Sequence, residues 1–126
     1  MKLTRTADFA LKVLVYLSGE KELITMPVLS QKLAIPYNNL SKLVQTLAKA
    51  QIVQTKQGKN GGLKLLKKAE NISVKMIVDL IDGPTNLADC IGNSEFCKSN
   101  KTCRLKGKLK YIQNKIDEVL EEVKIG

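Results

Sequence analysis

Two stretches of helical periodicity, separated by a break at residues 34–36, come directly before a glycine-rich turn. Thr25 is a predicted N-cap of the first stretch, and Pro27 follows in its first turn. The residues expected on its buried side are Val28, Leu29 and Leu33. The second stretch runs from about residue 37 to residue 50. Its apolar stripe consists of Leu40, Leu43, Val44 and Leu47. Two helices joined by so short a turn are typical of a helix-turn-helix.

The glycine-rich turn at residues 58–62 lies between two β-type runs, residues 52–55 and residues 63–66. This arrangement predicts a β-hairpin. Three further helices are expected from N-caps, stops and apolar spacing, over about residues 4–18, 73–81 and 104–123. Thr4 and Ser73 are the predicted N-caps of the first two. The sequence therefore predicts a mostly α fold with a small β-hairpin, which is a winged helix-turn-helix followed by a long C-terminal helix.

The positive charge of the chain lies in its first half. The sequence has 21 Lys plus Arg and 12 Asp plus Glu, a formal net charge of +9. Residues 1–68 hold 12 basic and 3 acidic side chains, whereas residues 69–126 hold 9 of each. A polyanionic partner explains this division, and double-stranded DNA is the polyanion that a helix-turn-helix binds.

The second helix of the pair is expected to enter the major groove, with the hairpin beside it on the DNA backbone. Asn and Gln pair with adenine edges, Lys donates to guanine, and Ser and Tyr suit phosphate oxygens. A solvated polar face on an ordinary helix is the plain alternative. The predicted DNA-binding residues are Tyr37, Asn38, Asn39, Ser41, Lys42, Gln45, Lys59, Asn60, Gly61 and Gly62.

All three cysteines, Cys90, Cys97 and Cys103, lie in one polar stretch. Core packing does not account for three thiols in such a stretch, and gathered thiolates favour soft metals. An iron–sulfur cluster, zinc, and plain or redox-active thiols all stay open on spacing alone. Three thiolates leave one coordination position to fill, and the chain has neither a histidine nor the Cys-x-x-Cys pairs usual for structural zinc.

The lack of histidine also excludes Ser-His-Asp and Cys-His catalysis within the chain. The acidic residues show no pairing that suits general acid–base chemistry, so no enzymatic activity is expected. The longest apolar run, residues 13–17, is far shorter than the roughly 18 residues of a membrane span. The N-terminus is polar and predicts no signal peptide, so we expect a cytoplasmic protein without a membrane partner.

Apolar residues on the last helix recur every three or four positions, which is a short heptad seam. They are Leu105, Leu109, Ile112, Ile116, Val119 and Val123. So long a helix has little core to cover in so small a protein, although packing on its own chain is the alternative. A symmetric homodimer through this helix is therefore expected, and it would offer two groove-reading helices to a palindromic operator.

The chain resembles, over essentially its whole length, the iron–sulfur-cluster winged-helix transcription regulators of the NsrR and IscR type. The resemblance begins at residues 1–8 and includes the turn at 58–62. It is most specific at residues 94–97 (Ser-Glu-Phe-Cys) and 103–106 (Cys-Arg-Leu-Lys), which look like the NsrR branch. It implies a homodimeric DNA-binding repressor that senses nitric oxide through a [4Fe-4S] or [2Fe-2S] cluster.

The same resemblance implies that Cys90, Cys97 and Cys103 hold this cluster and that Asp8 of the partner subunit completes the coordination. The IscR-type histidine three residues after the last cysteine is replaced by Lys106, so an IscR-type ligand set is not expected. A regulator of the same family that senses iron or cluster supply is an alternative. A zinc-stabilised DNA-binding protein without sensing is another.

The predicted domains are a winged helix-turn-helix DNA-binding domain over residues 1–83, a cysteine-bearing cluster loop over residues 84–103, and a dimerisation helix over residues 104–126.

Overall fold

The computed structural model describes residues 2–59, 61–84, 86–87 and 104–126. Asn60, Cys90, Cys97 and Cys103 lie outside these residues, so the predictions made for them stay predictions. The elements are α1 (Arg5–Ser18), α2 (Met26–Leu33), α3 (Tyr37–Lys49), β1 (Val53–Lys56), β2 (Gly62–Leu65), the 3-10 turn η1 (Ala69–Asn71), α4 (Val74–Asp82) and α6 (Arg104–Glu122). The expected order of helices and hairpin is confirmed.

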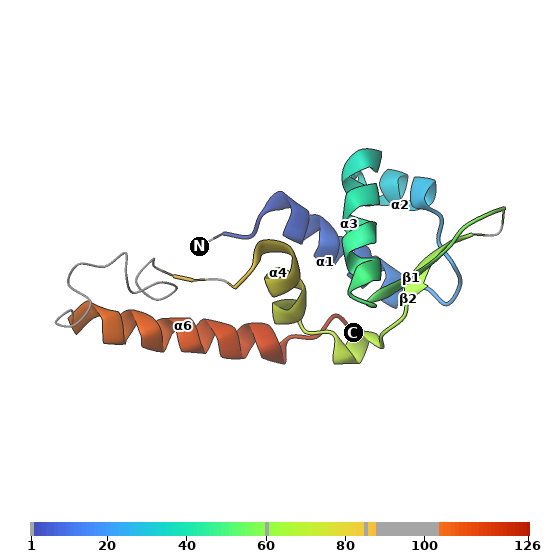
Figure 1. The fold of residues 1–126 in the computed structure, drawn as a ribbon. Coiled ribbons are helices and arrows are strands. Elements are labelled where there is room, and N and C mark those ends of the chain that lie inside the picture. Colours follow the sequence, from blue (N-terminus) through green and yellow to red (C-terminus); the bar gives the residue numbers. More distant parts are fainter. Residues whose placement is uncertain (1, 60, 85, 88–103) are drawn as a thin grey trace.

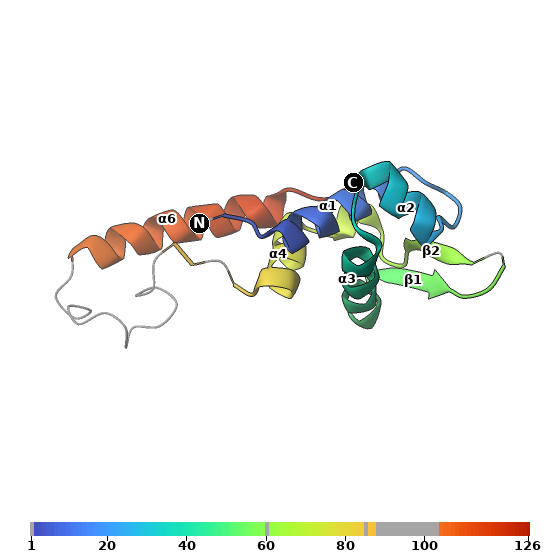
Figure 2. The ribbon, with the colours of Figure 1, turned by 90° about the horizontal axis from the view of Figure 1, so that it is seen from above.

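The molecule has a head and an arm. The head contains α1 to α4 and the hairpin, which we call the wing (Figure 1). Both views show α6 running away from the head on the side opposite the wing (Figures 1 and 2). None of the helices in the described part of the chain is long and apolar enough to cross a membrane.

The helix starts are set by side chains close in sequence. Thr4 Oγ1 accepts a hydrogen bond from the Ala7 N–H at 3.1 Å, and Ser73 Oγ accepts one from the Met76 N–H at 3.0 Å. Thr25 caps α2 in the same way. Each such cap stabilises its helix by about 1 kcal/mol, and all three were predicted from the sequence.

The turn between α2 and α3 is a single left-handed residue followed by an apolar anchor. Ala34 has φ 54° and ψ 42°. The Ser30 hydroxyl donates to the Ile35 carbonyl oxygen at 2.6 Å, and the Ile35 side chain is 1% exposed. A residue forced into the left-handed region needs such surrounding contacts. The turn therefore fixes α3 relative to α2.

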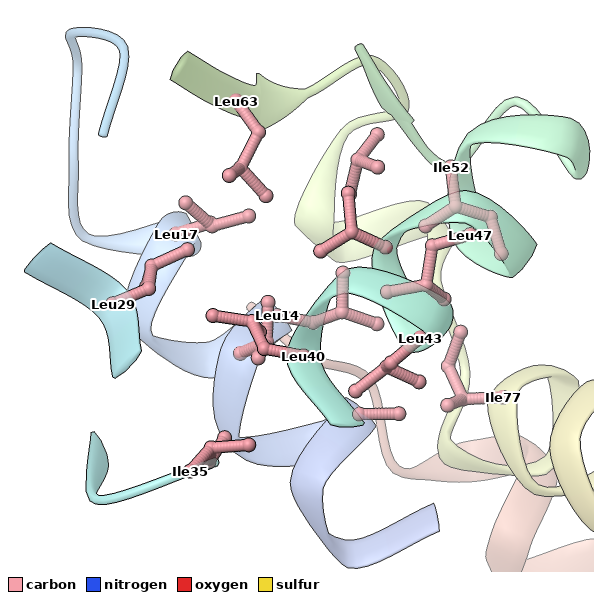
Figure 3. Close-up of a cluster of buried hydrophobic side chains, with 14 of the residues drawn as sticks. Leu14, Leu17, Leu29, Ile35, Leu40, Leu43, Leu47, Ile52, Leu63 and Ile77 are labelled. Atoms are coloured by element: carbon pink, nitrogen blue, oxygen red, sulfur yellow. The ribbon is translucent and has the colours of Figure 1, made fainter. Parts of the chain in front are cut away.

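The core of the head holds α3 by its apolar face. Leu40 and Leu47 are fully buried against side chains of α1, α2, β2 and α4 (Figure 3). A fully buried leucine contributes roughly 1.5–3 kcal/mol. The predicted stripe on α3 is confirmed, but the prediction for α2 was partly wrong, since Val28 is 40% exposed. In this short helix Leu29 is the buried residue, and Val28, 100° away around the axis, does not face α1 or α3.

The wing is an antiparallel pair in which Val53 pairs with Leu65 and Lys56 pairs with Gly62. A Cβ added at Gly61 would clash with the Lys56 carbonyl oxygen. One added at Gly62 would lie 2.7 Å from the backbone oxygen of Ile24. Both positions need glycine because backbone approaches too closely for any side chain.

The C-terminal end of α6 is fastened to the head by backbone hydrogen bonds. The Val74 N–H donates to the Val123 carbonyl oxygen at 2.8 Å, and the Ile125 N–H donates to the Ile72 oxygen at 2.9 Å. Ile125 also packs against the core of the head. The arm therefore moves with the head at this end, while its first turns lie beyond α4 (Figure 1).

Candidate nucleic-acid interface

The outer face of α3 carries polar side chains at helical spacing. Asn38, Lys42 and Gln45 are exposed, and steps of four and three residues put them opposite the buried stripe. Lys49, one further step of four along, is exposed as well. A helix of this kind can present amide and ammonium donors to base edges.

A groove separates α3 from the wing. It is lined by Tyr37, Ser41 and Gln45 of α3, by Lys56 and Gly58 of the wing and by Thr25 at the start of α2. Three predicted residues of α3 are thus brought together with the wing. Thr25 and Lys56 were not among the predicted DNA-binding residues. The N-cap at Thr25 was a usable signal, because helix N-termini bind phosphate.

The other flank of α3 faces the opposite way. Asn39 and Lys42 line a smaller crevice with Thr6 of α1 and with Leu80 and Ile81 of α4. Asn39 is therefore set apart from the groove beside the wing, although it remains exposed. The predicted polar face of α3 is divided between two flanks, with Lys42 on the boundary.

At the tip of the wing Lys59 is exposed, while Gly61 and Gly62 are half-buried. The close approaches at the two glycines give them a structural role in shaping the wing. Whether they also contact DNA stays a prediction.

Asp8 lies in the first turn of α1. Its side chain is 49% exposed, and its Oδ2 is 2.8 Å from the Lys12 Nζ. An exposed pair four residues apart on a helix is weak, at about 0.3–0.5 kcal/mol. The carboxylate is therefore accessible and only loosely held.

The start of α1 is tied to the end of α4. The Thr4 N–H donates to Asp82 Oδ2 at 3.3 Å, and the Thr4 hydroxyl donates to Asp82 Oδ1 at 2.5 Å. Asp82 is the last residue of α4, and Gly83 follows it toward the cysteines. The first turn of α1 thus lies beside the point where the cysteine-bearing stretch begins.

Four of the six residues of the predicted seam are exposed, and Val123 is one of them, with 50% of its surface exposed. Leu105, Ile112 and Val119 are 56%, 45% and 57% exposed, and Leu109 and Ile116 are half-buried. The adjacent Tyr111 is 63% exposed, and it shares a shallow apolar hollow with Ile112 and Val119. Such a row of exposed apolar residues is typical of an interaction surface.

Among the described residues, no group of three or more Cys, Asp or Glu side chains is placed to hold a metal ion.

Comparisons with known proteins agree with the winged-helix architecture. The model of the Rrf2 family, described as iron-dependent transcriptional regulator, matches residues 3–126. The HTH-type transcriptional regulator NsrR of Shouchella clausii is 31% identical over 125 residues, which cover 97% of this chain and 84% of that protein. NsrR of Halalkalibacterium halodurans is also 31% identical, covering 97% and 86%. The structure of CymR, the global cysteine regulator of B. subtilis, is similar with a TM-score of 0.80 at 19% identity, over 99% of this chain and 93% of that one. This chain belongs to the Rrf2 family of transcriptional regulators.

Proposed function

We propose that this protein is a homodimeric DNA-binding repressor whose affinity for a palindromic operator is controlled by an iron–sulfur cluster that responds to nitric oxide. The observation that carries the proposal is the accessible Asp8 carboxylate on a helix that packs against α3. The NsrR-like motifs at residues 94–97 and 103–106 and the two relatives named NsrR support the choice of signal.

The donor set fits such a cluster. Cys90, Cys97 and Cys103 would supply three thiolates from one protomer, and Asp8 of the partner subunit would supply a carboxylate. Half of the Asp8 side chain is exposed, and its ion pair with Lys12 is too weak to keep it from another partner. When bound, the cluster supplies iron atoms with which nitric oxide reacts.

The residues of the chain connect this centre to DNA. Asp8 would hold α1 in place, and α1 shares the core with α3 through Leu14 and Leu40. Release of Asp8 would free α1 to shift and would change the spacing between the two α3 helices of the dimer. The two sites would then be coupled by about 1–3 kcal/mol, as is typical of allosteric proteins.

A specific observation favours one alternative. The family model is described as an iron-dependent regulator, which suits a protein that senses iron or cluster supply. Both functions use the same cysteines, so only the signal distinguishes them.

The deciding experiment uses protein purified without oxygen. Iron and sulfide analysis with native mass spectrometry is expected to show a dimer that contains both elements. A DNA duplex selected from a random library by this protein is then titrated after treatment with nitric oxide or with an iron chelator. A change of about 5- to 150-fold with nitric oxide supports the proposal. A response to the chelator alone favours supply sensing, and colourless protein with zinc contradicts the cluster.

Two groups of side chains are expected to affect DNA binding differently. Lys59→Ala should weaken binding to all duplexes and lower the salt slope by about one unit, because a lysine on the backbone displaces counterions. Asn38→Ala and Lys42→Ala should instead change which sequence is preferred, with about 1–3 kcal/mol of discrimination lost. Titrations across salt concentrations with matched and scrambled duplexes measure both effects. Lys108→Ala on α6 is the control, and a flat salt response of the parent protein would contradict the polyanion argument.

A further inference from the structure

Gln113 is the one fully buried residue of α6, with 3% of its surface exposed. Gln113 lies outside the apolar seam predicted for this helix, so its burial was not expected from the sequence. A buried amide needs hydrogen-bond partners for both its oxygen and its nitrogen. The partners of Gln113 indicate what it does.

The Gln113 side chain binds a segment distant in sequence. The Leu87 N–H donates to Gln113 Oε1 at 2.5 Å, and Gln113 Nε2 donates to Asp117 Oδ1 at 3.0 Å. An ionised carboxylate only accepts hydrogen bonds, so Asp117 fixes the nitrogen on its own side. The oxygen is thereby left facing Leu87.

Asp117 interacts electrostatically with Lys75 of α4. The pKa of Lys75 is raised, chiefly by its hydrogen bond with Asp79 and also by the charges of Asp117 and Glu121. The ammonium of Lys75 is therefore charged at neutral pH and attracts the carboxylate of Asp117. Gln113 therefore joins Leu87 to α6 by hydrogen bonds, and Lys75 of α4 adds an electrostatic attraction to Asp117.

We propose that Gln113 is a positioning residue for the cysteine-bearing stretch. Leu87 precedes Cys90 by three residues, and Cys103 directly precedes the first residue of α6. Gln113 lies nine residues beyond Arg104, about 14 Å along the helix. Leu87 and Arg104, the described residues that flank the cysteines, are thus both attached to α6, which fixes the separation of these two flanking residues. The inference rests on the proposed function, because its consequence is the retention of the cluster.

The test exchanges the amide of Gln113 and the carboxylate of Asp117 between the two positions. Gln113→Met removes both hydrogen bonds and keeps a side chain of similar length. Gln113→Glu places a second carboxylate beside that of Asp117. The double variant Gln113→Glu with Asp117→Asn keeps an acceptor for Leu87 and restores a donor between the two side chains without changing the net charge. Asn114→Ala, an exposed amide on the same helix, is the control.

Three readouts are compared in the full-length dimer: amide hydrogen exchange at Leu87 without iron, the rate of iron loss to a chelator, and the melting temperature. Gln113→Met is expected to exchange at Leu87 and to lose iron about tenfold faster than the parent, as fits a lost hydrogen bond with an unsatisfied partner. Gln113→Glu is expected to raise both rates as well, because its carboxylate is repelled by that of Asp117 and moves away from the Leu87 N–H. The double variant should return both rates to within about twofold of the parent, and Asn114→Ala should leave them unchanged.

Unchanged exchange or iron loss in Gln113→Met overturns the positioning role. A lower melting temperature without rescue of iron retention in the double variant also overturns it, since that pattern indicates a merely structural residue. A parent protein that takes up neither iron nor sulfide overturns the proposed function itself, and the positioning role with it.

Discussion

Substitution of any one of Cys90, Cys97 and Cys103 by alanine is expected to give protein without iron–sulfur absorbance. Three thiolates already leave one position of a cluster to another ligand, and the chain has no histidine to replace a lost cysteine. Loss of a thiolate therefore removes a ligand for which no substitute is available. Absorbance spectra with iron and sulfide analysis of anaerobically purified variants measure the result.

Asp8→Ala is expected to weaken the binding of the cluster, whereas loss of a cysteine abolishes it. A carboxylate from the partner subunit is the replaceable fourth ligand, so this variant should still form a cluster but lose iron faster, by about 10- to 100-fold. Lys12→Ala is the matched control, because it removes the ion pair of Asp8 and leaves the carboxylate in place. A cluster that survives the loss of any cysteine, or that is as stable in Asp8→Ala as in the parent, contradicts the ligand assignment.

The elements that the sequence predicted well are those determined by neighbouring residues. Thr4, Thr25 and Ser73 cap their helices because a side-chain oxygen reaches an amide three residues on. The wing likewise follows from glycines that must accept a close backbone approach. The strand bounds differ by one residue from those expected, since β1 ends at Lys56 and β2 begins at Gly62.

The features that sequence reasoning missed depend on contacts between distant segments. Gln113 is polar and lies among charged residues on α6, so no local pattern predicts that Leu87 covers it. Val28 is apolar and was expected to be buried, but the contacts of α2 are on another side of that short helix. The separation of Asn39 from the wing groove depends on where α1 and α4 pack. The burial of Gln113, the exposure of Val28 and the placement of Asn39 all depend on how the helices pack in the tertiary structure.

The second large effect is expected at the exposed seam of α6. The double variant Ile112→Glu with Val119→Glu should be monomeric, because dimerisation would bury two unpaired carboxylates on each protomer at several kcal/mol apiece. Both side chains are about half exposed in one protomer, so the head should fold unchanged. Light scattering gives the mass, and circular dichroism checks the helix content.

DNA binding should respond strongly to this loss of the dimer. A dimer binds two half-sites at once, and separating the halves removes an avidity of about 10²–10⁴. The operator affinity of the double variant should therefore fall by at least about 100-fold, while its weak binding to unrelated duplexes persists through the basic head. Lys110→Glu is the control, since residue 110 lies on the opposite side of α6 from Ile112 and is also exposed. A double variant that stays dimeric with parental affinity would place the dimer contact elsewhere, and the shared cluster would then need another route between protomers.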